Sequence, residues 1–245
     1  MKKLLIGMIG VLLMSQTQAQ DIKPYNPSFV AKWVPSSLFF GKIGIGTEYN
    51  FKKKRSVTFN FGLPSEYELT QNIDNKDRTL KMKTTSVMAG YRMYLGKRPM
   101  TAFYFEPYVK YVKNTASTNT DFDISGTTKP FLLSTTYSGF GIGAQLGLQM
   151  MIAKRVVLDW YILGPEANSS KFDLDAQETG SGAAWDATAA NDAKQEIDNF
   201  VKDVPIVGSK TTVTVNSSAR NVHAAYKGFL PGFRTGLSLG IRLGK

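Results

Sequence analysis

The sequence contains no cysteine, only one histidine and no long uninterrupted apolar segment. Without cysteine, the chain can form neither disulfides nor thiolate metal sites. After residue 14, no segment has the ~18 consecutive apolar residues that a membrane-spanning helix needs. If the chain enters a membrane, we therefore expect a closed β-barrel, because only helices and closed barrels satisfy every backbone hydrogen bond in lipid.

The N-terminus has the pattern of a secretion signal. Lys2 and Lys3 precede an apolar stretch over residues 4–14, and small residues flank a cleavage position after Ala19. This pattern predicts a signal peptide at 1–19 and a mature chain at 20–245. An uncleaved anchor helix is the less favoured alternative. We expect export across the inner membrane.

Positive charge exceeds negative charge, with 30 Lys and Arg against 19 Asp and Glu. A basic balance can indicate nucleic-acid binding. Here the basic residues are scattered and the chain is exported, so we expect no nucleic-acid partner. Some cations cluster at 52–55, 97–98 and 154–155, where outer-membrane lipid headgroups are a candidate partner and a solvated turn is the simpler reading.

Alternation of apolar and polar residues is the main structural signal. Between residues 237 and 243, leucine and isoleucine occupy the odd positions, while serine, glycine and arginine occupy the even ones. Such a strand has one apolar and one polar face. In a membrane barrel the apolar face meets lipid and the polar face lines the interior. The predicted strands are 28–35, 37–51, 56–69, 80–95, 101–115, 134–151, 155–166 and 232–244.

The connections between these strands alternate between short basic turns and long polar segments, as in outer-membrane barrels. The sequence therefore predicts an all-β fold, an eight-stranded antiparallel up-and-down transmembrane β-barrel with one long external loop carrying a short helix. A soluble β-sandwich is the alternative. Aromatic residues expected on the outward face fit girdles at the membrane interfaces: Tyr49, Phe51, Tyr91, Phe103, Tyr111 and Trp160.

Charged residues fall on the face predicted to line the lumen. Side chains just fill an eight-stranded barrel, and buried charges must pair. We therefore expect a plugged, ion-paired interior, with a gated or anion-selective conduit as the alternative. The predicted lumen charge network comprises Lys42, Glu48, Arg92, Glu106, Lys110, Asp159, Arg234 and Arg242.

The segment 167–231 breaks the strand pattern and is predicted to be the long external loop. Within it we expect a helix capped by Asn191 and ended by Pro205, followed by a short strand over 211–215. The apolar side of this helix could cover the barrel mouth or bind an external protein partner. Its apolar residues recur at helical spacing: Ala193, Ile197, Phe200, Val201 and Val204.

No cofactor or metal site is expected. Asp173 and Asp175 lie in an acidic stretch but lack the full spacing of a calcium loop. Gly141 and Gly143 fall within a predicted strand with no helix after them, so they do not form a nucleotide-binding loop.

Catalysis has little support. A lipid-modifying site would need a base, an orienting acid and a hydroxyl nucleophile within reach. His223 has Ser217, Ser218 and Tyr226 near it in sequence, and Glu166 could lie near it in space. These spacings are unspecific, so we expect His223 to be an exposed loop residue and the protein not to be an enzyme.

Two motifs carry a resemblance to a known family. They are the run Phe39-Phe-Gly-Lys-Ile-Gly-Ile-Gly-Thr-Glu-Tyr49 before a basic turn and the final run Pro231-Gly-Phe-Arg-Thr-Gly-Leu-Ser-Leu-Gly-Ile-Arg-Leu243, together with the Ala19-Gln20 start of the mature chain. The chain resembles the small outer-membrane β-barrel domain proteins of unknown function from Gram-negative bacteria. The resemblance implies no catalytic residues. The chain departs from the pattern by ending Leu-Gly-Lys245, where such proteins often end on an aromatic residue.

These observations predict a protein of the cell outer membrane with a structural or surface-interaction role through its external loop. A narrow channel for small solutes, a lipid-modifying enzyme and a soluble ligand-binding periplasmic barrel are the alternatives, in that order. Fold alone cannot choose among them.

Overall fold

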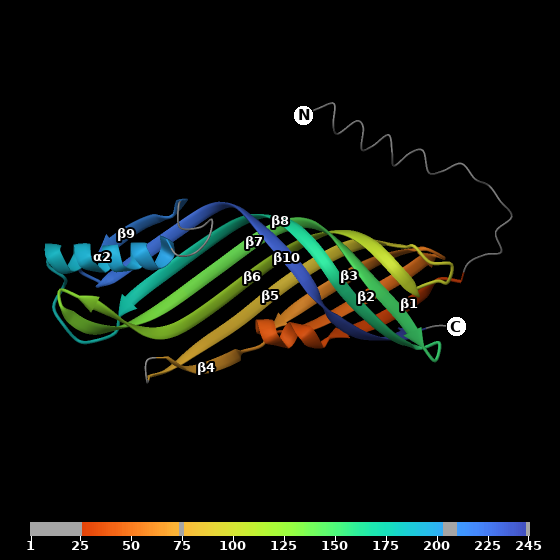
Figure 1. Ribbon diagram of the computed structural model, residues 1–245, viewed down its shortest axis with the longest axis horizontal. Helices are drawn as coiled ribbons and strands as arrows, with labels where there is room; N and C mark the ends of the chain where they lie inside the picture. Colours follow the sequence, from red (N-terminus) through yellow and green to blue (C-terminus); the bar gives the residue numbers. More distant parts are fainter. Residues whose placement is uncertain (1–25, 74–75, 203–209, 244–245) are drawn as a thin grey trace, which may run out of the picture.

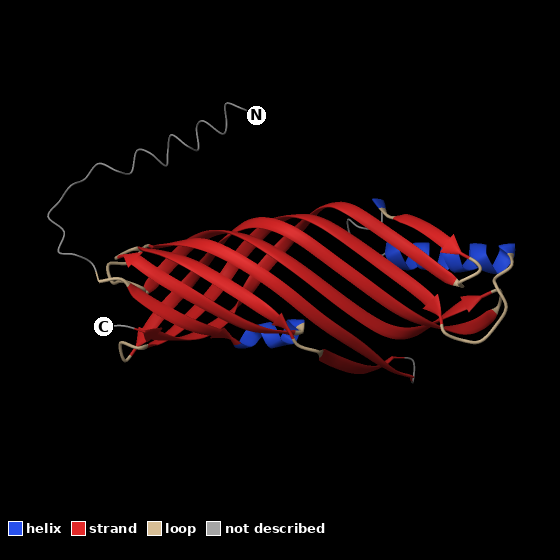
Figure 2. Cartoon of the chain, turned by 180° about the vertical axis from the view of Figure 1, so that it is seen from behind, coloured by secondary structure: helices blue, strands red, loops and turns tan. Residues whose placement is uncertain are grey.

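The computed structural model is an elongated barrel of tilted antiparallel strands (Figure 1). It describes residues 26–73, 76–202 and 210–243. The predicted signal peptide at 1–19 lies outside these residues. Strands make up almost the entire wall, and two helices lie at its side and at one end (Figure 2).

Eight strands close the ring, and each pairs antiparallel with its neighbours. The ring closes where Trp33 of the first strand pairs with Leu239 of the last. In order around the ring, the strands are β1 (Ser28–Val34), β2 (Lys42–Lys52), β3 (Arg55–Pro64), β5 (Lys76–Tyr94), β6 (Ala102–Ile124), β7 (Thr127–Ile152), β8 (Val156–Glu178) and β10 (Asn221–Leu243).

Two further strands extend the sheet without entering the ring, so the sheet has ten strands where the sequence predicted eight. β4 (Tyr67–Ile73) pairs only with β5, and β9 (Thr212–Asn216) pairs only with β10. The predicted eight-stranded barrel is nevertheless confirmed, because the closed ring contains eight strands.

The alternation of apolar and polar residues along each strand determines which side chains face outward and which face the lumen. On β6, Phe103, Phe105 and Tyr111 are exposed on the outer side, whereas Tyr104 and Glu106 between them are fully buried in the lumen. The same alternation on the other wall strands gives the barrel an apolar outside and a polar inside.

The predicted strand boundaries need correction at two places near the start of the chain. Residues 37–40, expected in a strand, belong to the 3-10 helix η2 (Pro35–Phe40), whose first residue is a proline that cannot donate to a ladder. The predicted strand 56–69 is two strands, because β3 ends at Pro64 and β4 begins at Tyr67.

The predicted loop 167–231 contains long stretches of strand. β8 continues to Glu178 and β10 begins at Asn221, while β6 and β7 also run well past their predicted ends at 115 and 134. Serine, threonine and aspartate replace the apolar residues on the outer face of these extensions, so the apolar outer face that marks the rest of each strand is missing there. We call this part of the sheet the distal extension, and the opposite end, where β1 starts and β10 ends, the proximal end.

The helix α2 (Ala187–Lys202) packs on the inner face of the distal extension. Asp186 caps it, since Asp186 Oδ1 accepts a hydrogen bond from the Ala189 N–H at 2.8 Å. The predicted start at Asn191 was therefore wrong by more than a turn, because small residues precede the apolar stripe. The predicted stop at Pro205 lies outside the described residues. Within the described ranges, no helix is long and apolar enough to cross a membrane.

The apolar side of α2 is buried in one cluster with the strands. Ala193, Ile197 and Val201 are each about 1% exposed. They pack with residues of four strands and with Trp185: Ile124, Phe131, Leu133, Leu174, Ala176, Val222, Ala224 and Tyr226. The apolar side of the helix thus packs on the inner face of the distal extension, where the sequence analysis had expected it to cover the barrel mouth or to bind a partner.

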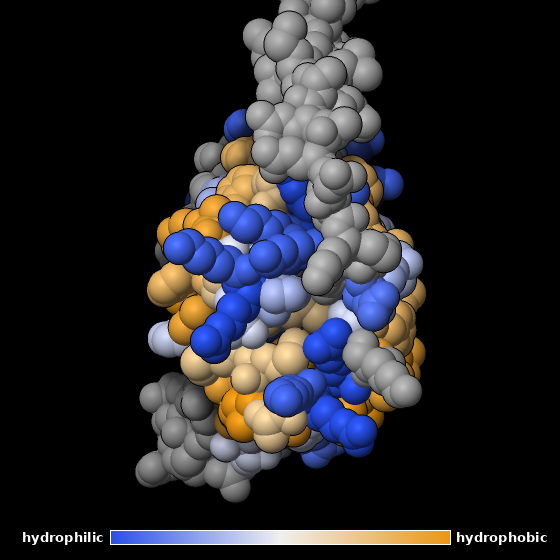
Figure 3. Space-filling model, turned by 90° about the vertical axis from the view of Figure 1, so that its right-hand side faces the viewer, coloured by the Kyte–Doolittle hydropathy of each residue, from blue (hydrophilic) through white to orange (hydrophobic). Residues whose placement is uncertain are grey.

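The proximal end is closed by short turns that carry the basic clusters. Hydrophilic side chains gather over this end and apolar ones lie along the flanks (Figure 3). The turn between β5 and β6 folds inward and places Met100 in the lumen, where it is fully buried beside Val30, Tyr104 and Val157. Met100 thereby forms an apolar floor at the proximal mouth.

Candidate functional site in the barrel lumen

A buried cluster of charged side chains crosses the proximal half of the lumen, and Arg92 lies at its centre. Its Nε donates to Glu106 Oε2 at 2.7 Å, and its Nη1 donates to Asp159 Oδ2 at 2.8 Å. Nη1 also lies 3.4 Å from Glu48 Oε2. Arg92 is 3% exposed and the three carboxylates are at most 2% exposed. One guanidinium therefore contacts carboxylates from three other wall strands.

Lys32 supplies the second cation of this cluster. Its Nζ lies 2.7 Å from Glu48 Oε2 and 2.7 Å from Asp159 Oδ2. Since Lys32 is on β1 and Asp159 on β8, the pair bridges across the closure of the ring. The cluster, Lys32 and Arg92 with Glu48, Glu106 and Asp159, has two positive and three negative charges. We call it the charge cluster.

Neutral groups satisfy the remaining oxygen atoms of the three carboxylates. Tyr104 OH donates to Asp159 Oδ1 at 2.7 Å, and Tyr94 OH donates to Glu48 Oε1. Gln145 Nε2 donates to Glu106 Oε2 at 3.0 Å, and Thr58 donates to its other oxygen. Buried charges are tolerated when they are paired and hydrogen-bonded in this way.

Two glycines make room for these side chains on the inner wall. A Cβ added at Gly90 would lie 2.3 Å from Glu106 Oε1, and one at Gly147 would lie 2.3 Å from the Tyr104 ring. The glycines on the lumen face therefore have a packing role, because any side chain there would displace a member of the network.

The charge cluster leaves almost no space for solvent. The gap among its members has a volume of about 10 Å³, at or below the ~10–15 Å³ that one water molecule requires. The Arg92 guanidinium also stacks 3.7 Å from the centroid of the Tyr104 ring. The side chains of the charge cluster are consequently tightly packed at this level of the lumen.

A second group of charges lies on the distal side of the cluster. Lys110 Nζ forms an ion pair with Glu166, whose other oxygen accepts a hydrogen bond from Tyr108 OH at 2.9 Å. Lys42 Nζ donates to Ser86 Oγ at 3.1 Å. Lys42, Ser86, Lys110, Glu166 and Arg234 line a cavity of about 750 Å³. We call it the upper cavity.

The structure divides the predicted network of eight charges into separate groups. Glu48, Arg92, Glu106 and Asp159 meet in the charge cluster, and Lys42, Lys110 and Arg234 line the upper cavity. Arg242 belongs to neither group, because its Nη1 lies 3.9 Å from Met151 Sδ near the proximal end.

Sequence reasoning missed two members of these groups. Lys32 was overlooked because its inward neighbours Val30 and Val34 are apolar, which hides the polar face of β1. Glu166 was taken as the end of a strand, and strict alternation from Asp159 would place it outside, because a bulge near Leu163 shifts the inward positions of β8 by one residue. The alternation of β8 therefore gave no signal for Glu166, because the bulge depends on pairing with the neighbouring strands.

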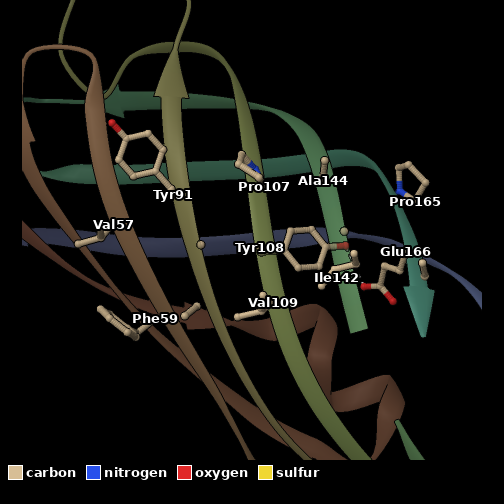
Figure 4. Close-up of a pocket in the computed structure, with 14 residues that line it drawn as sticks. Val57, Phe59, Tyr91, Pro107, Tyr108, Val109, Ile142, Ala144, Pro165 and Glu166 are labelled. Atoms are coloured by element: carbon tan, nitrogen blue, oxygen red, sulfur yellow. Dashed lines mark hydrogen bonds between the residues drawn. The ribbon is translucent and has the colours of Figure 1, made fainter. Parts of the chain in front are cut away.

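The outer surface carries the aromatic residues where the sequence placed them. Tyr49, Tyr91, Phe103, Tyr111 and Trp160 are each at least 37% exposed, and the Phe51 ring packs against Tyr91 at a tilt of 43°. Between larger side chains, small residues on neighbouring strands form a shallow apolar groove (Figure 4). Pro107, Ala144 and Pro165 line it, with Phe59 and Ile142 among its larger residues.

The residues named for a possible catalytic site do not converge. His223 lies on the outer face of β10, with Nδ1 3.0 Å from Asp175 Oδ1. Tyr226 is on the opposite face and donates to the Phe229 carbonyl oxygen, while Glu166 is occupied inside the lumen by Lys110 and Tyr108. The histidine thus has an acid beside it but neither Tyr226 nor Glu166.

Comparisons with known proteins identify a family and show a similarity to solved structures. The family described as outer membrane protein beta-barrel domain matches residues 31–190, more than half of the chain. A solved structure of CarO from Acinetobacter baumannii is 10% identical, covers 90% of this chain and 99% of the CarO chain, and has a TM-score of 0.39. No curated protein matches the sequence.

Proposed function

Because this chain belongs to the outer membrane protein beta-barrel domain family and is a protein of the cell outer membrane, we propose that it is a non-conducting barrel with a structural or surface-interaction role. The charge cluster carries the first half of this proposal. It contacts most of the ring, it is buried, and the gap that Lys32, Arg92 and Asp159 line has a volume of only about 10 Å³. An ion crossing the lumen would have to break several buried charge-assisted bonds at once.

Planar-bilayer recording tests the closed lumen. We expect no steady unit currents from the purified protein under an applied voltage. The double variant Arg92→Ala and Glu106→Ala, which removes one charge of each sign from the cluster, serves as the open reference and should conduct. Steady unit currents from the unmodified protein would instead support the alternative function, a narrow channel for small solutes.

The distal extension supports the surface-interaction half of the proposal. In a barrel of this kind the longer connections face the outside of the cell, and the longest connection here joins β8 to β10 through α2. Gln195 on α2 is exposed, and the β9 strand has no partner on its second edge within the described residues. These features offer a polar helix face and a strand edge to an external partner.

Labelling in whole cells tests this orientation. Because the chain has no cysteine of its own, only an introduced cysteine can react. A membrane-impermeant maleimide should label Gln195→Cys on intact cells. The matched variant Lys154→Cys, in a proximal turn, should react only after lysis. Labelling in the reverse order would overturn the proposal.

Lipid modification by His223 is the remaining alternative, and only its contact with Asp175 favours it. The variant His223→Asn should leave the composition of the lipid A in the outer membrane unchanged relative to cells with the parent protein. A changed lipid A profile would favour the enzyme instead.

A further inference from the structure

The barrel wall is incomplete beside the upper cavity. β1 pairs with β10 only up to Trp33 and Leu239, and β9 pairs with β10 only at residues 221–225. On this side, residues 226–236 of β10 have no strand partner within the described part of the chain. We call this stretch the open seam.

The helix η2 holds the proximal end of the seam in place. Ser36 Oγ donates to the Leu237 carbonyl oxygen and accepts from the Leu237 N–H, each at 3.2 Å. At its other end, the Gly41 carbonyl oxygen accepts the Thr84 N–H of β5 at 2.8 Å. On the proximal side of the open seam, the segment of η2 and Gly41 is therefore hydrogen-bonded to β10 at one end and to β5 at the other. There η2 takes the place of paired strands in the wall.

The open seam lies at the level of the apolar outer surface. Phe233 on β10 is 60% exposed and Phe40 on η2 is 57% exposed, and both residues also line the upper cavity. The cavity therefore reaches from the lumen charges to side chains that face lipid. Its space continues sideways toward the apolar side of the wall.

Packed side chains border the upper cavity on both axial sides. The charge cluster lies on the proximal side, where the gap lined by Lys32, Arg92 and Asp159 has a volume of about 10 Å³. On the distal side, Phe172 and Leu230 line the cavity and also pack against the apolar cluster that α2 covers. The seam is consequently the route that the wall leaves for a ligand.

The charges of the cavity select the sign of that ligand. Lys42, Lys110 and Arg234 face one carboxylate, Glu166, so the lining carries two excess positive charges. Glu166 is already bound by Lys110, whereas Lys42 has one neutral hydrogen-bond partner. Arg234 stacks 4.6 Å from the Tyr161 ring, and its Nε is buried without a hydrogen-bond partner among the described residues. An anionic group would satisfy Lys42 and Arg234 together.

We propose that the upper cavity binds one long-chain fatty acid from the membrane, with its carboxylate on Lys42 and Arg234 and its acyl chain passing through the open seam into the bilayer. A cavity of about 750 Å³ lies within the ~300–1,000 Å³ range of small-ligand sites. The positive charges of Lys42 and Arg234 would bind the carboxylate of the fatty acid. The lipid-facing phenylalanines at the open seam would contact its acyl chain. The inference extends the proposed function, because a closed lumen directs the ligand sideways.

Displacement of cis-parinarate from the protein in phosphatidylcholine nanodiscs tests the site. Oleate should displace it from one saturable site per barrel, while methyl oleate, which lacks the charge, and acetate, which lacks the chain, should not. Displacement by acetate as efficient as by oleate would show a site for free anions, and equal displacement by methyl oleate would show an uncharged apolar cavity. Either result overturns the proposal and needs no substituted protein.

Matched variants locate the site. Lys42→Met and Arg234→Met should each weaken oleate binding by about tenfold or more, because each removes a charged partner of the carboxylate. Lys227→Met, which removes an exposed outward lysine from the same strand as Arg234, should leave binding within about twofold. Equal affinity in all three variants overturns the assignment. A conducting barrel that still binds oleate would refute the proposed function and leave this inference intact.

Discussion

Arg92 is the residue on which the charge cluster most depends. It is the only described cation that contacts Glu106, and it shares Glu48 and Asp159 with Lys32. The cluster already has one more negative than positive charge. Loss of the guanidinium would leave three buried carboxylates with a single ammonium, which is strongly unfavourable in a low-dielectric interior.

The variant Arg92→Met tests this dependence. We expect it to lower the free energy of unfolding by ~3–5 kcal/mol, the cost of removing one partner of a buried ion pair. Urea unfolding in phosphatidylcholine vesicles, followed by tryptophan fluorescence, measures the change. Lys202→Met removes an exposed lysine paired with Asp198 and should cost well under ~1 kcal/mol. A similar small loss for both variants would contradict the account.

Gly147 is a second residue whose role follows from the geometry. A methyl group there would meet the Tyr104 ring, which donates to Asp159. The variant Gly147→Ala should therefore destabilise the barrel by ~1–3 kcal/mol, as overpacking does. Gly180→Ala is the matched control, because the nearest atom to its added Cβ is 3.9 Å away. The same unfolding assay compares them, and equal stability of the two variants would show that the Tyr104 ring moves freely.

At the scale of elements, the distal extension is held by packing that differs from the rest of the barrel. Its inner face is apolar and is covered by α2, whereas the inner face below is charged. Ile197 is 1% exposed at the centre of this contact, and Gln195 on the same helix faces solvent. The extension is thus a small soluble-type core built onto a membrane barrel.

The variant Ile197→Ala should loosen the extension alone. Truncating a buried isoleucine costs ~2–5 kcal/mol, and we expect faster hydrogen exchange in the distal residues of β8 and β10 without change in their lipid-facing parts. Gln195→Ala should leave exchange unaltered. Faster exchange throughout both strands would mean that the extension and the barrel unfold as one unit.

The elements also show what the sequence could predict. The lipid-facing half of each strand was predictable, because a strictly alternating apolar face is needed only where lipid lies outside. The extensions of β6, β8 and β10 were not, since Ser169, Lys171 and Asp173 on the outer face of β8 read as a polar loop. Pairing across strands, which a single strand pattern does not contain, keeps these residues in the sheet.

The lumen was predictable in kind and only partly in detail. Alternation assigned Glu48, Arg92, Glu106 and Asp159 to the inside, where the structure places them. It could not divide the charges into two levels, because the level of a residue depends on the register between strands. The upper cavity was equally hidden, since it exists because β1 stops at Val34 and η2 follows.

At the scale of the whole molecule, the barrel has two surfaces of opposite character and a third region that matches neither. The outer face of the ring is apolar, the lumen is charged, and the distal extension has a polar outside over an apolar core. The three tryptophans lie in two of these regions, the outer face of the ring and the core of the distal extension. Trp33 and Trp160 are 46% and 49% exposed on the ring, whereas Trp185 is 6% exposed beneath α2.

Quenching of tryptophan fluorescence by brominated acyl chains tests directly whether lipid covers the ring. Three variants, each keeping one tryptophan and replacing the other two by phenylalanine, are reconstituted in vesicles of brominated phosphatidylcholine. The account predicts strong quenching for the variants that keep Trp33 or Trp160, and none for the one that keeps Trp185. Unquenched fluorescence from Trp33 and Trp160 would contradict it, because the exposed side chains of the ring would then have no contact with the hydrocarbon of the bilayer.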